Sequence, residues 1–460
     1  MSLRLRLFRD PSENNPNCAV LHLDTARTKW SLVFSRAIKS FPNMNKKQLI
    51  LIFFIALISR VLFSQFSGVE VFGGDWGRYD DQSNNILKGE FNLEGSLFIT
   101  APLYSYLVAG LKYIFKSTYA PVLELLQILL SAVSAIYLTK TAQLIFKKNN
   151  ISFICGIFYG VYPVTLYFTH TFGQESIFQS LFIVTIYFIS KFLCYKQRND
   201  LILFSILFSL ALLTKSHILL IIPFFLAGLI IIKGVNYDSI SDVIIVVGVI
   251  FLLTLPYGIY NKMVNGVYVI SSSGQGGHFL TGHNDDTYTY LVDSPPRDTL
   301  EYKRLKSMDY MIFRNLAPKL DGLTHAEKQS LYLRTGFDWI KNNPIKAVKL
   351  FFVNLRNFLM PGFNIQHYPF NAWLSAFIMS APIFVFAYIE IVRGCITNYK
   401  EHIPILSIFL GMLLFSLGFY TQNRFRVITL EPFYVMYACA GFVRLFEYRR
   451  ENRFRNRDVI

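Results

Sequence analysis

The first residues whose types could do chemistry follow an apolar run near residue 67. Asp75, Asp80 and Asp81 lie within seven residues of one another, with Arg78 between them. An enzyme that removes the proton from an acceptor hydroxyl needs one positioned carboxylate, whose pKa is raised by neighbouring acids and lowered by an arginine. The alternative is a solvated acidic turn at the start of a helix, where Asp is common. Spacing alone does not separate these two interpretations.

The composition places these residues in a membrane protein. Of the 460 residues, 53% are hydrophobic and only 16% are charged, which is outside the range of soluble domains. The net charge of +16 is typical of a polytopic protein with basic cytoplasmic loops, so we expect no nucleic-acid partner. The five cysteines are scattered without a CxxC pair, which indicates neither a disulfide framework nor a zinc site.

Apolar runs long enough to cross a bilayer predict an all-α polytopic bundle of about ten transmembrane helices. The predicted spans are residues 48–67, 120–146, 151–169, 173–193, 201–214, 217–232, 240–258, 372–392, 403–420 and 427–446. One further run, Pro102 to Phe115, is short and typical of an interfacial helix. Basic loops lie on the cytoplasmic side of a membrane protein. The basic connections between the predicted spans all fall on that side only if this run does not cross.

This topology divides the chain into five parts. The predicted parts are a cytoplasmic tail (1–47), a transmembrane catalytic module (48–260) that includes a first outer loop (68–120), a large extracytoplasmic loop (261–371), C-terminal transmembrane helices (372–446) and a basic cytoplasmic tail (447–460). Both outer loops are expected to carry short helices. Residues 1–47 hold nine basic residues and three acidic ones, and the lysines after Met44 resemble the start of a signal anchor, so we expect translation to begin at Met44.

Three cations fall at the outer membrane boundary in this topology. They are Lys215, Arg424 and Arg426. Cations at that depth suit a lipid phosphate, although Lys and Arg also snorkel at helix ends for structural reasons. Glu175 lies on an outer connection beside His170 and could polarise an acceptor or orient Asp75, or it could simply favour a helix N-terminus.

A possible metal site lies in the large loop. Its residues are His278, His283, Asp285 and Asp286. Their spacing is not diagnostic without a helix, and such residues often occupy plain turns in glycine-rich loops. We therefore assign no metal ligands and expect no obligatory cofactor, with a divalent metal as the less favoured alternative.

Several ordered motifs resemble the GT-C glycosyltransferases, in the group of protein O-mannosyltransferases and lipid A aminoarabinose transferases. They are Asp75-x-x-Arg78-Tyr79, residues 85–90, residues 101–107, Leu213-Thr214-Lys215, Glu175, Asn343-Pro344 and residues 423–426. The resemblance covers most of residues 48–446. It implies that Asp75 is the catalytic base with Glu175 beside it. Arg78, Tyr79, Lys215, Arg424 and Arg426 would bind substrate.

The resemblance implies a multi-pass enzyme of a bacterial or archaeal cell membrane, with its active site facing outward. It would move a sugar from a polyprenyl-phosphate donor to a hydroxyl of a protein, lipid or glycan acceptor. One departure concerns the aminoarabinose transferases, which carry a Glu-Lys pair where this chain has Ile99-Thr100. Modification of lipid A specifically is therefore not expected.

Two other functions remain open from the sequence. A carrier or flippase for lipid-linked sugars would need charges along an intramembrane path, and the predicted span centres are nearly free of them. A glycan polymerase or ligase would use a diphosphate-linked oligosaccharide donor and would share the same lipid class.

Overall fold

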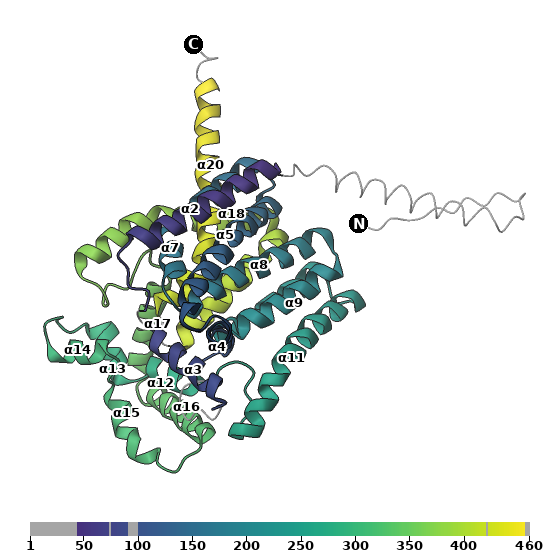
Figure 1. The fold of residues 1–460 in the computed structure, drawn as a ribbon. Helices are drawn as coiled ribbons and strands as arrows, with labels where there is room; N and C mark the ends of the chain where they lie inside the picture. The colour runs from purple at the N-terminus through teal and green to yellow at the C-terminus, as the bar shows by residue number, and fades with distance from the viewer. Residues whose placement is uncertain (1–43, 73–74, 91–99, 420–421, 456–460) are drawn as a thin grey trace, which may run out of the picture. The chain divides into compact units, whose positions relative to one another are not determined.

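The computed structural model describes residues 44–72, 75–90, 100–419 and 422–455. Asn45–Ile460 forms one compact unit, which is described here by itself. The described residues are helical and contain no strand (Figure 1). Residues 1–43 of the predicted tail lie outside them, and the expected start at Met44 stays a prediction.

The long apolar helices form a bundle, and short helices fill the two predicted outer loops. The bundle helices are α2 (Lys46–Phe66), α5 (Tyr119–Phe146), α6 (Asn149–Gly160), α7 (Pro163–His170), α8 (Gln174–Tyr195), α9 (Arg198–Leu212), α10 (Ile222–Lys233), α11 (Tyr237–Asn265), α18 (Phe370–Gly418), α19 (Asn423–Thr429) and α20 (Glu431–Arg455). The loop helices are α3 (Trp76–Lys88), α4 (Leu103–Phe115), α12 (Gln275–Gly282), α13 (Asp285–Tyr288), α14 (Leu300–Lys306), α15 (Met311–Leu316), α16 (His325–Asn342) and α17 (Pro344–Leu359).

The expected count of ten spans is not confirmed. Among the described residues, six helical stretches are long and apolar enough to cross a membrane, or seven if α6 and α7, bent by 46°, form one broken span. The helix α18 is interrupted at Asn398, where φ is −157° and ψ is 61°, between the predicted spans at 372–392 and 403–420. The predicted spans at 201–214 and 427–446 are helical but fall short of this test, because α9 has only 15 residues and α20 carries too many charges.

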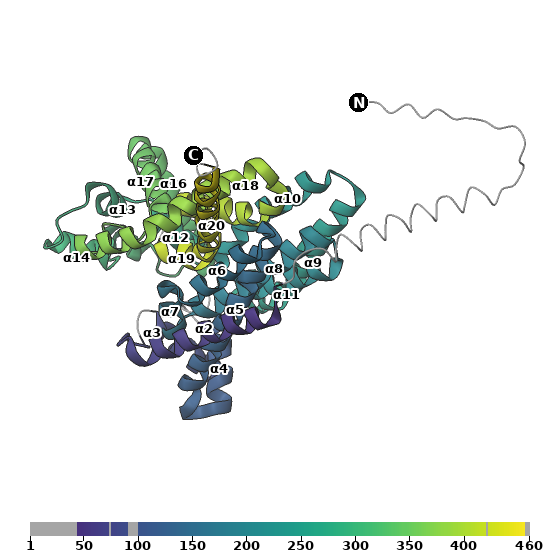
Figure 2. The same cartoon turned by 90° about the horizontal axis from the view of Figure 1, so that it is seen from above.

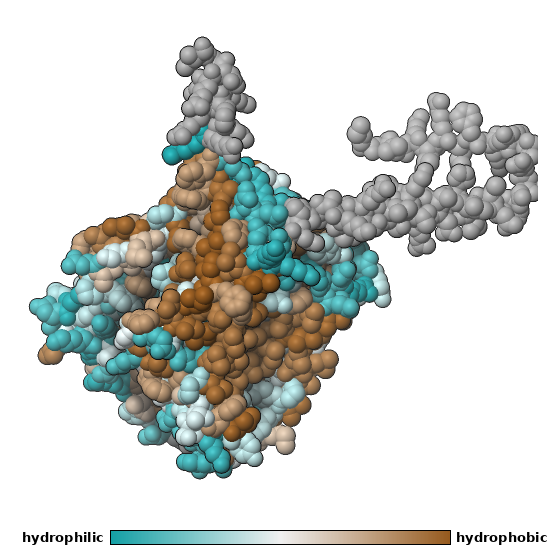
Figure 3. Space-filling model, turned by 45° about the horizontal axis from the view of Figure 1, so that its top comes forward, coloured by the Kyte–Doolittle hydropathy of each residue, from teal (hydrophilic) through white to brown (hydrophobic). Residues whose placement is uncertain are grey.

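The surface agrees with membrane insertion. Large apolar side chains are exposed along α2, where Ile58 is 54% exposed, and along α11, where Leu252 is 64% exposed. Figure 3 shows apolar surface across the bundle, with hydrophilic surface toward its ends and over the loop helices. Exposed apolar surface of this extent marks contact with lipid, so the chain is an integral multi-pass membrane protein.

The short helix α4 differs in direction from the bundle. It is viewed nearly along its axis in Figure 1 and side-on in Figure 2, whereas α8 and α9 lie across the view in Figure 1. The chain turns between α4 and α5 at Lys116, which has a positive φ of 49°. That α4 stays on the membrane surface remains a prediction.

The helices of the large loop have a core of their own. Its members are Tyr288, Tyr290, Leu291, Tyr302, Leu305, Tyr310, Trp339 and Leu350. This aromatic cluster fixes α13 to α17 as a packed unit (teal to green in Figure 1), which gives the loop enough rigidity to position side chains for chemistry.

Candidate active site

Asp75 lies at the start of α3. Its side chain makes no capping hydrogen bond to the helix, so the carboxylate is not used as a cap. Trp76 and Tyr79, in the first turn of α3, are buried against Phe172 in one apolar cluster. Because these aromatic side chains anchor the helix, the carboxylate that precedes them has a fixed position.

Three backbone and hydroxyl contacts bring distant segments to Asp75. The amide of Phe172 donates to the carbonyl of Val71 at 2.9 Å, which joins the first outer loop to the start of α8. The amide of Leu103 donates to the carbonyl of Leu213 at 2.9 Å, beside Lys215. From the large loop, Ser271 Oγ donates to the carbonyl of Leu212 at 2.6 Å. Both outer loops therefore meet at the connection that carries Lys215.

A chain of ion pairs links four residues from these segments. Arg424 Nη1 lies 2.6 Å from Asp75 Oδ2 and 3.9 Å from Glu175 Oε1. Lys215 Nζ lies 2.7 Å from the same Glu175 oxygen. The structure thus brings Asp75, Glu175, Lys215 and Arg424 into one network of two acids and two bases, although they are far apart in sequence.

The network has a buried half and an accessible half. The side chains of Lys215 and Glu175 are 4% and 9% exposed, whereas those of Arg424 and Asp75 are 36% and 29% exposed. A substrate hydroxyl can reach the accessible carboxylate from solvent. The buried ammonium can be contacted only by a group that enters the site. Chemistry at this site would therefore take place on the Asp75 and Arg424 side.

The surrounding charges tune the Asp75 carboxyl. Burial raises its pKa, but the combined effect of Arg424, Arg78 and Lys215 is larger, and the pKa lies below its ordinary value. Conversely, burial and then the charges of Glu175 and Asp75 raise the pKa of Tyr79. Asp75 is therefore an ionised acceptor near neutral pH, and Tyr79 keeps its proton.

Gln174 is a site residue that the sequence analysis missed. With its amide oxygen directed toward Lys215 Nζ and the Tyr79 hydroxyl, both contacts are 2.9 Å long, and its nitrogen donates to the carbonyl of Thr214. It links α3, α8 and the Lys215 connection. Its position directly before Glu175 was the available signal. Phe425 was also missed, and its ring centre lies 5.3 Å from Lys215 Nζ and 5.6 Å from the Arg424 guanidinium.

The other predicted substrate-binding residues have different surroundings. Arg78 is exposed and acts on Asp75 through its charge. Arg426 is 1% exposed. Its nitrogens donate to the carbonyls of residues 357, 358, 360 and 362 at 2.7 to 3.1 Å and contact Glu431 at 3.3 Å. These bonds occupy the guanidinium with the end of α17 and the segment that follows it, so we leave Arg426 out of the substrate contacts proposed below.

The remaining acids of the first loop have partners of their own. Asp80 Oδ1 lies 2.7 Å from Lys112 Nζ, which joins α3 to α4. Glu124 Oε1 lies 2.8 Å from His170 Nδ1, so His170 is paired with Glu124 rather than with Glu175.

His278 reaches the site from α12. Burial lowers the pKa of its imidazole, and the charges of Arg424, Arg78 and Lys215 lower it further, so the ring is neutral at pH 7. His283 instead contacts the carbonyl of Phe279 at 3.0 Å. In the described part of the chain, no three His, Cys, Asp or Glu side chains come together as a metal site.

An apolar cavity of about 840 Å³ opens beside Arg424. It lies between α2, α7 and the segments on either side of α18. Its lining includes Phe63, Tyr167, Phe168, Phe363, Tyr368, Gln422 and Arg424. A ligand with a charged end and a long apolar body would fit such a lining, since the aromatic walls bury the body and the guanidinium meets the charge.

Comparisons with known proteins bear on this arrangement. Residues 100–260 match the family model of dolichyl-phosphate-mannose-protein mannosyltransferases. The fold is similar to that of the archaeal oligosaccharyltransferase AglB from Archaeoglobus fulgidus, solved with an inhibitory peptide and a dolichol-phosphate, with a TM-score of 0.51, 13% identity and 89% of this chain covered. The resemblance to the GT-C glycosyltransferases is confirmed. The matched family consists of glycosyltransferases that use lipid-linked sugar donors.

Other solved GT-C proteins are also similar. ArnT from Cupriavidus metallidurans, in the apo state, matches with a TM-score of 0.36 and 13% identity over 90% of this chain and 77% of that chain. The same protein bound to undecaprenyl phosphate matches with a TM-score of 0.35 and 12% identity over 90% and 78%. This chain spans about half, 52%, of the length of the AglB chain. No curated protein sequence matches this one.

Proposed function

We propose that the chain transfers a sugar from a polyprenyl-phosphate donor to an acceptor hydroxyl on the extracytoplasmic face of the membrane. The observation that carries this proposal is the accessible Asp75 carboxylate, which is joined through Arg424 to the buried Lys215. One side of this network can accept a proton and the other can hold a phosphate. The family match over residues 100–260 supports the same class of reaction.

The reaction is a single displacement. Asp75 takes the proton of the acceptor hydroxyl while its oxygen forms a bond to the anomeric carbon of the sugar. The bond between that carbon and the phosphate oxygen breaks, and its electron pair leaves with the polyprenyl phosphate. Attack opposite the leaving group inverts the anomeric carbon. Asp75 then releases the proton to water.

Arg424 has two roles in this scheme. Before the donor binds, Arg424 contacts Asp75 and holds its pKa low. When a phosphate enters between Arg424 and Lys215, it competes for the guanidinium, since charge-assisted hydrogen bonds to phosphate are strong. The hold on Asp75 weakens and its pKa rises, so the carboxylate becomes a better base when the leaving group is in place.

The apolar cavity beside Arg424 suits the prenyl chain of the donor. Its aromatic lining begins at the guanidinium and continues between α2 and α7. The phosphodiester already carries one negative charge, and a second one develops on the leaving oxygen as its bond to the sugar breaks. Lys215 and Arg424 can stabilise this second charge. Metal assistance is not required in this scheme.

The first prediction tests Asp75 as the base. Purified protein in detergent is incubated with a panel of labelled polyprenyl-phosphate sugars, and release of the sugar to acceptor or water is measured. Asp75→Asn should lower this release by at least about 10²-fold, the scale of general base catalysis, and should remain folded. Asp81→Asn, at an exposed position of α3, is the matched control and should keep full activity. An active Asp75→Asn protein would exclude Asp75 as the base, and a wild-type protein that uses none of the donors would overturn the proposed function.

A further inference from the structure

A polar pocket lies at the end of the bundle opposite to the Asp75 network. The helix α8 starts at Gln174, beside Glu175 in the site, and runs for 22 residues, or about 33 Å at 1.5 Å per residue. At its far end, an open pocket of about 650 Å³ is formed where α8, α9, α10 and α11 meet. Its lining residues are Phe192, Lys196, Arg198, Lys233, Asn236, Asp238 and Asp242.

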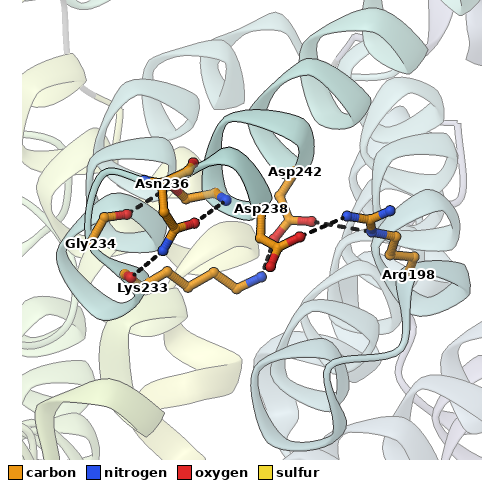
Figure 4. Close-up of polar contacts among 7 residues, drawn as sticks. Arg198, Lys233, Gly234, Asn236, Asp238 and Asp242 are labelled. Atoms are coloured by element: carbon orange, nitrogen blue, oxygen red, sulfur yellow. Dashed lines mark hydrogen bonds and ion pairs between the residues drawn. The ribbon is translucent and has the colours of Figure 1, made fainter.

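The walls of this pocket are fixed by polar contacts (Figure 4). Asn236 caps α11 by accepting from the amide of Ser239 at 2.9 Å, and its amide donates to the carbonyl of Lys233 at 2.8 Å. Lys233 pairs with the buried Asp242, and Arg198 Nη2 lies 3.3 Å from Asp238 Oδ1. The two carboxylates thus balance the charges of Lys233 and Arg198.

Lys196 adds a positive charge that no carboxylate in the described part of the chain pairs with at ion-pair distance. Its backbone is held in the left-handed region, with φ 58°, where it ends α8. Its ammonium lies 5.9 Å from the centre of the Phe192 ring, and the ammonium of Lys233 lies 4.9 Å from the same centre. Burial and then the like charge of Lys233 lower the pKa of Lys196, and the opposing effects of Cys194 and Asp242 do not cancel this lowering. An anion in the pocket would relieve this repulsion.

The depth of the pocket favours a lipid over a soluble ligand. Three of the candidate spans end or begin here, namely Gln174–Tyr195, Ser216–Lys233 and Tyr237–Met263. A pocket at the ends of spans lies at the level of the headgroups. Beside it, Val235 and Tyr237 are 82% and 84% exposed, which offers apolar contact to acyl chains while the pocket receives a charge.

We propose that this pocket binds the phosphate of an anionic phospholipid headgroup, with Lys196 and Arg198 contacting its oxygens. The acyl chains would lie against Val235, Tyr237 and the exposed side of α10. The pocket lies at the far end of α8, about 33 Å along the helix from Glu175. The proposed lipid site is separate from the proposed transfer reaction. Its occupancy does not depend on the identity of the sugar donor.

Native mass spectrometry of the full chain in detergent tests this site. Equal amounts of phosphatidylglycerol and phosphatidylcholine with identical acyl chains are added, and the retained lipids are counted. The wild-type protein should retain phosphatidylglycerol preferentially. Lys196→Asn removes the charge with a residue that tolerates left-handed backbone, and should weaken this retention about tenfold, as expected for loss of a charge-assisted contact. Lys196→Arg should retain it.

The matched control is Lys47→Asn, which removes one exposed charge at the start of α2 and should leave retention unchanged. If Lys196→Asn fails to fold, Arg198→Gln tests the same pocket and should also weaken retention. Equal retention of phosphatidylglycerol by the wild type and the folded pocket variant would overturn the proposal. Displacement of the lipid by millimolar glycerol 3-phosphate would overturn the lipid assignment in favour of a soluble phosphate. Activity of the Asp75→Asn protein has no bearing on these outcomes.

Discussion

Asp75 and Lys215 differ in burial in a way that suits the different tasks proposed for them. Asp75 is accessible and its carboxylate is kept ionised by Arg424, whereas Lys215 is buried and held by Glu175 and Gln174. A base must exchange protons with substrate and solvent, so it needs access. A phosphate ligand gains from low local dielectric, where a charge interacts more strongly. The environments match the roles proposed for each side chain.

The pH dependence of transfer should report the state of Asp75. Its pKa is lowered, so the free enzyme keeps its base at neutral pH, and kcat/KM should fall only below the ordinary carboxyl range near pH 4. Arg424→Gln removes the largest cause of this lowering, and the acid limb of the pH–kcat/KM profile should move upward by about one unit. Arg334→Gln, at an exposed position of α16, should leave it unmoved. An unchanged limb in Arg424→Gln would contradict the proposed coupling.

Variants of the buried pair Lys215 and Glu175 can separate the effect of Lys215 on stability from its effect on transfer. Lys215→Met removes the 2.7 Å partner of the buried Glu175 and leaves it only the 3.9 Å contact to Arg424, which should cost up to about 3 kcal/mol of stability. The double variant Lys215→Met with Glu175→Gln removes both charges and should recover most of that stability in thermal unfolding. Transfer should remain reduced by about 10²-fold, since the contact to the leaving phosphate is still absent. Recovery of transfer in the double variant would make Lys215 a structural partner only.

Sequence reasoning was most effective for residues whose chemistry is unusual in their setting. Asp75 and Lys215 stand next to apolar runs, where charge is costly, and the structure brings them into one network. Arg426 was selected by the same argument, yet its guanidinium is occupied by carbonyls after α17. Its partners depend on how the chain turns there, which no local pattern encodes. Gln174 was missed because an amide carries no charge to mark it.

At the scale of elements, the site depends on how α12 docks. Ser271 and Ser272 fasten the segment before α12 to the connection around Lys215, through the Leu212 carbonyl and Ser216 Oγ, each at 2.6 Å. The helix α12 then packs on α16 with almost no space between them. A Cβ at Gly276 would lie 2.2 Å from the carbonyl oxygen of Gln329. This close approach positions His278 beside the ion-pair network.

Gly276→Ala should therefore separate α12 from α16. The obstructing atom belongs to the backbone, so a shift of one helix is required, at a cost of about 1–3 kcal/mol. We expect a lower midpoint of thermal unfolding and reduced transfer. Gly110→Ala is the control, because a Cβ there meets nothing within 4 Å and alanine favours helix. Equal stability of the two variants would show that the contact between α12 and α16 is not tight in solution.

At the scale of the whole molecule, the class of fold was predictable because apolar runs and basic loops are strong signals. The number of spans was not. The helices α6 and α7 are bent into one possible span and α9 has only 15 residues, because bundle packing, rather than apolar length alone, determines where a helix stops. The direction of α4 could not be predicted from hydropathy either, since a helix of 13 mostly apolar residues is compatible with both orientations.

Whether α4 crosses the membrane decides on which side the segment after α4 lies relative to Asp75. If α4 stays on the surface, Ser117 after α4 and Asp321 in the large loop share one side, and Lys148 after α5 lies on the other. If α4 crosses, Ser117 lies opposite Asp75. Single cysteines at these exposed positions, in a chain whose native cysteines are replaced by serine, can be tested with a membrane-impermeant maleimide on intact cells. We expect Ser117→Cys and Asp321→Cys to be labelled before permeabilisation, and Lys148→Cys only after it. Protection of Ser117→Cys together with labelling of Asp321→Cys would require α4 to span, with Asp75 and the large loop outside and the end of α4 on the opposite face. Protection of Asp321→Cys before permeabilisation would contradict the outward-facing site.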